Sequence, residues 1–154
     1  DIIIEQFRPG VMKRLGLDYE SIKKINSKII YVSITGYGQT GPKKMVAGHD
    51  LNYIGNTGLL SLSMGTKEKP TVPPALIADI AGGSYPAIIN ILLALRKRDL
   101  HQTGSFLDIS IKSLLIFLIE ILHFSPIDLI IFFNSVLLSS LSSGTGNLIN
   151  CPSI

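Results

Sequence analysis

Two short apolar runs constrain what this chain can fold into more than any other feature. Ile2–Glu5 and Ile29–Ile34 are almost continuously apolar, so a strand formed from either run would bury both of its faces. The residues between them predict two short helices, near Val11–Leu15 and Asp18–Ile25, with Asp18 as the cap of the second. This strand–helix–strand order predicts a right-handed parallel α/β unit.

The rest of the first two thirds of the chain extends that pattern. Phe106–Ile111 alternates apolar and polar residues and predicts a third strand. Apolar residues at helical spacing predict helices near Leu51–Leu62 and Ala78–Arg98. The predicted fold class is therefore α/β, with a parallel sheet covered by helices.

Composition narrows the class of function. The chain has 154 residues, enough for one domain with a core, and its net charge of +3 comes from basic residues that are spread out. A scattered charge of this size argues against a nucleic-acid partner. The one cysteine, Cys151, excludes an internal disulfide and fits a reducing compartment. Because the chain starts at Asp1 directly on an apolar run, we expect it to begin inside a larger protein.

The composition changes at Lys112, and Leu114–Leu141 is very apolar. Glu120, Pro126 and Asp128 interrupt this run, and its longest uninterrupted piece is shorter than the roughly 18–20 residues that a membrane span needs. We therefore expect a buried helix from Lys112 to about Phe124 and no membrane span. The predicted division is a domain over 1–111 and an apolar helical segment over 112–154, with a membrane-associated fragment as the alternative.

A histidine and a carboxylate stand side by side at His49 and Asp50. The small residues Ala47 and Gly48 precede them, and a helical pattern follows, so one of the pair is expected near a helix N-cap. The positive end of the helix dipole would keep the imidazole neutral and ready to accept a proton. The alternative is that Asp50 only caps the helix and His49 is a loop residue.

A second carboxylate, Asp79, lies in or just before the first turn of the long predicted helix. Gly82 and Gly83 follow it and weaken the helix, but they let another backbone or a ligand approach closely. The structural alternative is that Asp79 caps this helix and the glycines serve packing. The glycine-rich stretch Gly36–Gly41 matches neither a dinucleotide-binding nor a Walker motif, which favours a shaped turn over a phosphate cradle.

Three segments, taken together and in order, resemble the class III CoA-transferase superfamily. They are Glu5–Gly16, Ala47–Tyr53 and Asp79–Ser84, and the resemblance is greatest to the racemase branch, which acts on 2-methylacyl-CoA thioesters. It covers about Asp1–Ile111 and implies part of a Rossmann-like, CoA-binding large domain. Beyond it, Lys112 and Ser113 stand where the family usually has an Asp-Gly pair.

The resemblance implies roles for individual residues. His49 and Asp79 align with the racemase acid/base pair, and no metal or cofactor is implied beyond the CoA moiety of the substrate. Phe7 could pack on the adenine, and Arg8 or Arg14 could pair with CoA phosphates. The positions that line the CoA site are Glu5, Gln6, Phe7, Arg8, Arg14, Gly48, His49, Asp50, Leu51, Asn52 and Tyr53.

The chemistry fits these residue types. Inversion at C2 of a thioester needs a base on one face of the carbon and an acid on the other. Near-attack distances on both faces would place His49 and Asp79 about 6–8 Å apart. The rival within the superfamily is a CoA-transferase that uses Asp79 as its nucleophile, but such enzymes generally lack a histidine at the position of His49.

The resemblance also implies an acyl-CoA substrate, a role in fatty-acid metabolism and an interlocked homodimer for the full-length protein. A bacterial protein of this kind would be cytoplasmic, and a eukaryotic one mitochondrial or peroxisomal. The resemblance places the family's first strand and its small domain outside this sequence, so we expect this chain to hold half of an active site and to be inactive alone.

Overall fold

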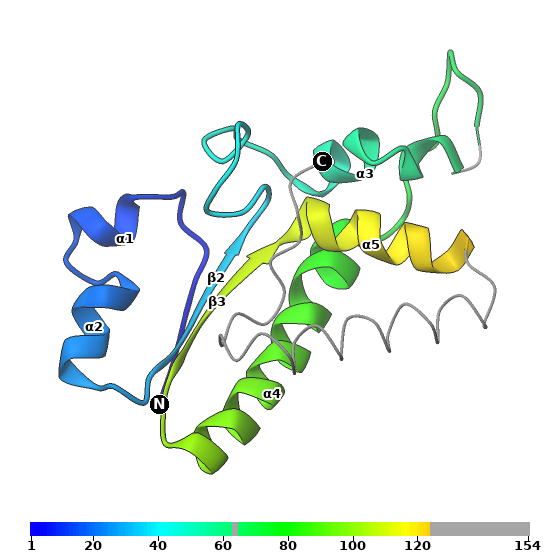
Figure 1. The fold of residues 1–154 in the computed structure, drawn as a ribbon. Coiled ribbons are helices and arrows are strands. Elements are labelled where there is room, and N and C mark those ends of the chain that lie inside the picture. Colours follow the sequence, from blue (N-terminus) through cyan, green and yellow to red (C-terminus); the bar gives the residue numbers. More distant parts are fainter. Residues whose placement is uncertain (63–64, 124–154) are drawn as a thin grey trace. The chain divides into compact units, whose positions relative to one another are not determined.

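A computed structural model of the chain describes residues 1–62 and 65–123 (Figure 1). Strands and helices alternate along it, as the apolar pattern predicted. The elements are β1 (Ile2–Glu5), α1 (Val11–Arg14), α2 (Tyr19–Ile25), β2 (Ile30–Thr35), α3 (Asp50–Asn56), the 3₁₀ helix η1 (Leu59–Leu62), the π-helical η2 (Ala78–Ser84), α4 (Tyr85–His101), β3 (Ser105–Ser110) and α5 (Ile111–His123).

The three strands form one parallel sheet in the order β1-β2-β3. Ile2 pairs with Ile30, and Ile30 pairs with Ser105, so all three strands run in register in the same direction. The predicted α/β class and all three predicted strands are confirmed, the second and third within one residue. Because the strands are parallel, the loops that follow them gather at one edge of the sheet.

The two faces of the sheet carry different residues. Ile30, Val32, Leu107 and Ile109 pack against α4 on one face and form the buried core with Ala87 and Ala94. On the other face, the rings of Tyr31 and Phe106 lie 6.1 Å and 5.4 Å from the ring of Tyr19 on α2. Figure 1 shows α2 and α4 on opposite sides of the sheet. Burial on both faces explains why the strands read as apolar runs.

Small residues in η2 allow a close contact beside the end of β3. A Cβ atom added at Gly82 would overlap the carbonyl oxygen of Ile111, and one at Gly83 would lie 3.3 Å from Cγ1 of the same residue. Both glycines are buried. This confirms the prediction that Gly82 and Gly83 permit a close backbone approach, and it fixes the start of the long helix at the sheet edge where the strands end.

One predicted helix is shorter than expected. The pattern predicted a helix over Leu51–Leu62, but α3 ends at Asn56 and a separate 3₁₀ turn follows. Gly58 takes a φ of 80°, the left-handed conformation that ends helices. The hydroxyl of Thr57 also donates to the carbonyl oxygen of Tyr53, over 3.0 Å, at this last turn. The apolar spacing of Leu59–Leu62 concealed the break.

The start of the apolar segment is helical, since α5 spans Ile111–His123 where a helix over Lys112–Phe124 was predicted. Contacts divide the chain into one unit over Asp1–Leu115 and a second unit that starts at Ile116. The rest of the predicted tail, including Leu129–Leu141, lies outside the described residues. The division into 1–111 and 112–154 stays a prediction.

Within the described residues, one helical stretch is long and apolar enough to cross a membrane. It is Ala78–His101, which comprises η2 and α4, and 28% of its most apolar window is buried. Part of it packs on the sheet through Ala87 and Ala94. The core helix of a soluble protein passes the same test of length and composition as a membrane-spanning helix. The predicted absence of a membrane span therefore stays a prediction.

Candidate active site

His49 stands at the start of α3. It is the N-cap residue, with an extended backbone at φ −130° and ψ 175°, and it is exposed to solvent. The backbone N–H of His49 donates to Oδ1 of Asn52 over 2.9 Å, which holds the loop against the first helical turn. The sequence left either His49 or Asp50 as the cap. The structure makes His49 the cap, because Asp50 is already the first helical residue.

The carboxylate of Asp50 joins this helix start to the start of η2. Its Oδ2 atom accepts a hydrogen bond from the backbone N–H of Asp79 over 2.9 Å, and the residue is only 5% exposed. Asp79 lies in the first turn of η2, as predicted. The side chain of Asp50 therefore brings together the two segments that carry His49 and Asp79.

Burial and two neighbouring residues shift the pKa of Asp79. Desolvation by burial raises the pKa of its carboxyl group, the negative charge of Asp50 raises it further, and the charge of His49 lowers it. No hydrogen bond joins the side chains of His49 and Asp79 within the described residues, and the expected separation of about 6–8 Å stays a prediction.

Tyr53 is a buried residue of α3. It is 5% exposed, and its hydroxyl donates to the carbonyl oxygen of Gly48 over 2.6 Å. Its ring meets the ring of Tyr37 edge to face at 5.4 Å. Burial raises the pKa of Tyr53, and Asp79 is the first charge that adds to this rise. Tyr53 thus belongs to the same electrostatic cluster as the two carboxylates.

Glycines make room for this ring. A Cβ atom at Gly36 would overlap the Tyr53 ring, and one at Gly48 would lie 2.7 Å from it. Gly36 directly follows β2, so the contact places α3 beside the sheet edge where the strands end. Gly38 and Gly41 in the same loop have φ values of 82° and 83°. The stretch is a shaped turn, as its sequence favoured, and Oδ2 of Asp108 on β3 anchors it by accepting from the N–H of Gln39 over 3.0 Å.

The N-terminal group of predicted CoA-site residues follows β1 at the same sheet edge. Glu5 is buried, and its Oε2 atom accepts from the N–H of Phe7 over 2.8 Å, which shapes the turn after the strand. Gln6, Phe7, Arg8 and Arg14 are exposed, with Phe7 at 54%. An exposed aromatic ring and two exposed guanidinium groups remain accessible to a nucleotide. No hydrogen bond or ion pair links this group to His49 or Asp79 in the part of the chain that the structure describes.

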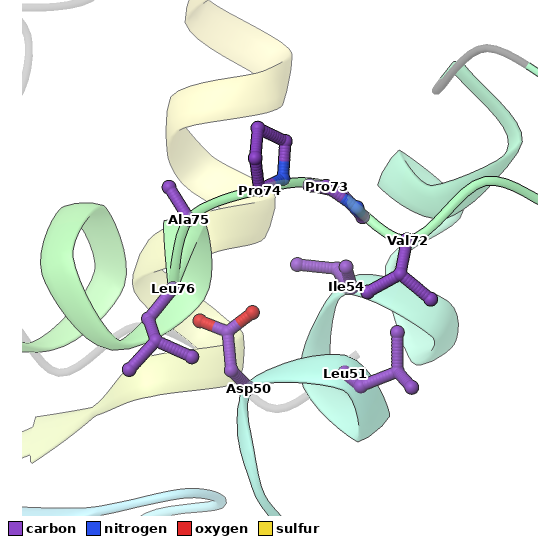
Figure 2. Close-up of a pocket in the computed structure, with 8 residues that line it drawn as sticks. All are labelled: Asp50, Leu51, Ile54, Val72, Pro73, Pro74, Ala75 and Leu76. Atoms are coloured by element: carbon purple, nitrogen blue, oxygen red, sulfur yellow. The ribbon is translucent and has the colours of Figure 1, made fainter.

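A cavity opens beside Asp50. It has a volume of about 260 Å³, and all of its lining residues except Asp50 are apolar (Figure 2). The lining residues are Asp50, Leu51, Ile54, Val72, Pro73, Pro74, Ala75 and Leu76. Neither His49 nor Asp79 lines it, although Asp50 connects it to both. The sequence predicted Leu51 and Asp50 as site residues but gave no signal for Val72–Leu76 beyond their extended, proline-rich character.

Comparison with known proteins decides the family. The family model described as CoA-transferase family III matches residues 1–123. The chain belongs to CoA-transferase family III. A solved CAIB/BAIF family protein from Brucella suis superposes with a TM-score of 0.72 at 31% identity, over 96% of this chain and 35% of that one. The parallel sheet described above is thus part of the α/β fold of CoA-transferase family III.

The names of relatives in the family describe more than one activity. Alpha-methylacyl-CoA racemase of Mus musculus is 40% identical over 110 residues, which are 71% of this chain and 29% of that protein. Succinyl-CoA:glutarate CoA-transferase of Mus musculus is 37% identical over 113 residues, 73% of this chain and 26% of that protein. The chain spans less than a third of the length of these relatives. CoA-transferase family III is a family of enzymes, and the names of these relatives include both a racemase and a CoA-transferase.

Proposed function

We propose that this chain carries the acid/base pair of an acyl-CoA racemase, which inverts C2 of a 2-methylacyl-CoA thioester. The observation that supports this most is the hydrogen bond from the Asp79 N–H to Oδ2 of Asp50. It ties the first turn of η2 to the first turn of α3, so His49 and Asp79 stand at two helix starts held next to each other. A base and an acid supplied by separate elements are what inversion at one carbon requires.

In the proposed reaction, neutral His49 removes the proton from C2 of the thioester. The electrons of the C–H bond move into the adjacent carbonyl group and form an enolate. Asp79, which is protonated at the start, gives its proton to the opposite face of C2, and the other enantiomer results. His49 then holds a proton and Asp79 is charged, so the reverse direction exchanges their roles and no further reactant is consumed.

The charges near Asp79 support the role of acid. Burial and the neighbouring charge of Asp50 raise the pKa of Asp79, which favours the protonated form needed in the forward step. A nucleophilic carboxylate would instead need the charged form. Phe7, Arg8 and Arg14 would bind the CoA moiety, the ring through the adenine and the guanidinium groups through phosphates, because all three are exposed after β1.

A CoA-transferase is the second candidate. The similarity to succinyl-CoA:glutarate CoA-transferase supports it, and Asp79 would then attack the thioester carbonyl and form an acyl anhydride while CoA leaves as the thiolate. A homodimer, and residence in the cytoplasm, mitochondrion or peroxisome, are proposals for the full-length protein. A non-catalytic membrane-associated fragment remains the rival outside enzymology, tested by partition of the chain between membrane and soluble fractions.

One experiment separates the two enzymatic candidates. The full-length protein is incubated with one enantiomer of 2-methylbutyryl-CoA in D₂O, with and without glutarate as acceptor. Deuterium at C2 is followed by NMR, and the enantiomer ratio by chiral chromatography. A racemase incorporates deuterium and forms both enantiomers without an acceptor. Transfer of CoA only when glutarate is present, with an acyl group on Asp79 that hydroxylamine traps, would overturn the racemase proposal.

Variants assign the roles. In the full-length protein, His49→Ala and Asp79→Ala should each abolish racemisation, while exchange of the C2 proton of one enantiomer persists because one base remains. His101→Ala is the matched control, since His101 is exposed at the far end of α4. Full racemisation by either site variant would contradict the two-residue mechanism.

A further inference from the structure

We propose that Tyr37 is a positioning residue for His49, because its ring supports the ring of Tyr53 and Tyr53 holds the backbone that carries the imidazole. This inference deepens the proposed function and rests on it, since it takes His49 as the base that acts on C2. Tyr37 lies in the loop that joins β2 to α3 (Figure 1). It was not among the site residues predicted from the sequence.

Tyr53 fixes the backbone on both sides of the peptide bond that precedes His49. Its hydroxyl donates to the carbonyl oxygen of Gly48 over 2.6 Å, and its backbone N–H donates to the carbonyl oxygen of His49 over 3.3 Å. A Cβ atom at Gly48 would lie 2.7 Å from the Tyr53 ring, so the ring packs directly on this backbone. A shift of the Tyr53 ring therefore shifts the backbone from which the His49 side chain projects.

Tyr37 and the residue before it support the ring of Tyr53. The ring centroids of Tyr37 and Tyr53 are 5.4 Å apart and their planes meet at 80°, an edge-to-face arrangement that stabilises beyond the area it buries. A Cβ atom at Gly36 would overlap the same ring, so the backbone of the loop also packs on Tyr53. The loop after β2 is thus a support for the ring that holds the His49 backbone.

The loop that carries Tyr37 is itself fixed at two places. The backbone N–H of Gln39 donates to both carboxylate oxygens of Asp108 on β3, over 3.0 Å and 3.3 Å. Nζ of Lys43 lies 5.8 Å from the centroid of the Tyr37 ring and donates to Oδ1 of Asn56 on α3 over 2.9 Å. Because the loop is bound to the sheet and to α3, the Tyr37 ring is held in place before any substrate binds.

Tyr19 on α2 provides a matched control for Tyr37. Both tyrosines are half-buried, and the ring of Tyr19 also lies 5.4 Å from another aromatic ring, that of Phe106. Nζ of Lys23 lies 5.3 Å from the centroid of Tyr19, as Lys43 lies near that of Tyr37. In the described part of the chain, no ring contact joins Tyr19 to α3. Replacement of Tyr19 therefore removes similar packing without a direct effect on His49.

The test compares Tyr37→Leu, Tyr37→Phe and Tyr19→Leu in the full-length protein by hydrogen exchange and mass spectrometry of the peptide Ala47–Tyr53. In Tyr37→Leu this peptide should exchange roughly three- to tenfold faster, the factor expected for the loss of one aromatic pair. Tyr37→Phe keeps the ring, and the hydroxyl it lacks accepts only a long hydrogen bond of 3.5 Å from Asn56. Tyr37→Phe and Tyr19→Leu should therefore leave exchange in this peptide close to that of the wild type.

Kinetics of 2-methylbutyryl-CoA racemisation give the second measurement. Tyr37→Leu should lower kcat by roughly three- to tenfold, because His49 spends less time in the productive position, while KM changes by less than about twofold. Tyr37→Phe should restore kcat to within about twofold of the wild type, since it restores the ring contact. A higher KM with an unchanged kcat would overturn the positioning role, because the loss would then lie in substrate binding.

The hydrogen-exchange result does not depend on the reaction. Unchanged exchange of Ala47–Tyr53 in Tyr37→Leu, or the same acceleration in Tyr19→Leu, would overturn the inference and leave the racemase proposal standing. Faster exchange in Tyr37→Leu alone, in a full-length protein that racemises no 2-methylacyl-CoA thioester, would overturn the proposed function while supporting the hold of Tyr37 on the His49 backbone.

Discussion

Removal of the Asp50 carboxylate should destabilise the protein more than any single surface change. In Asp50→Ala the Asp79 N–H loses its acceptor at 2.9 Å, and α3 loses the acidic residue of its first turn. A hydrogen bond to a charged acceptor contributes about 1.5–3 kcal/mol and an acidic residue at a helix start about 0.3–1 kcal/mol. Because Asp50 is 5% exposed, solvent screening reduces these values little, and we expect a loss of about 2–4 kcal/mol.

Asp50→Asn separates the hydrogen bond from the charge. The amide keeps an acceptor oxygen of similar position, so this variant should lose only about 0.5–1.5 kcal/mol. Urea unfolding followed by circular dichroism at 222 nm gives both differences, provided that the m-values agree. Glu68→Ala, an exposed acidic residue in the turn before Pro70, is the control and should stay within about 0.5 kcal/mol of the wild type.

Two results would refute this reasoning. If Asp50→Ala lost no more free energy of unfolding than Glu68→Ala, the link between α3 and η2 would not stabilise the folded state. If Asp50→Asn were as destabilising as Asp50→Ala, the charge or the size of the side chain, and not the acceptor oxygen, would be responsible.

Two further predictions concern backbone contacts and pH. Gly36→Ala should cost about 1–3 kcal/mol, since its Cβ atom would overlap the Tyr53 ring, whereas Gly55→Ala inside α3 should stabilise by about 0.5–1 kcal/mol; equal thermal shifts would contradict this. Because burial and Asp50 raise the pKa of Asp79, its contribution to stability is full below about pH 3.8 and is lost as pH rises through the folded-state pKa. The difference in urea midpoint between wild type and Asp79→Asn should therefore fall over that range, and a constant difference would show that the pKa is not raised.

Local pattern was enough to predict the sheet. Ile2–Glu5 and Ile29–Ile34 are apolar on both faces because helices cover both sides of the sheet, and burial of this kind leaves a direct trace in the sequence. The end of α3 was mispredicted because the prediction relied on the same local pattern of apolar residues. The spacing of Leu59–Leu62 continued a helical pattern, and the left-handed Gly58 that breaks it is a single residue.

The site could be predicted only in part. The sequence indicated His49, Asp50 and Asp79 as polar residues at helix starts, but a hydrogen bond between Asp50 and Asp79 depends on how two distant segments pack. The cavity wall at Val72–Leu76 gave no signal, because exposed apolar residues in a proline-rich segment look the same whether or not they line a cavity. The separation of His49 from Asp79 and the CoA contacts stay predictions.

The central claim is that His49 and Asp79 act on one substrate carbon from neighbouring positions, and the ionisation of Asp79 tests it most directly. The charge of His49 lowers the pKa of Asp79 when the two groups are close. Carboxyl carbon NMR of Asp79, followed through a pH titration, should therefore show a higher pKa in His49→Ala than in the wild type, and no change in His101→Ala. An Asp79 pKa that is unchanged or lower in His49→Ala would place the two side chains too far apart to share a carbon and would contradict the account.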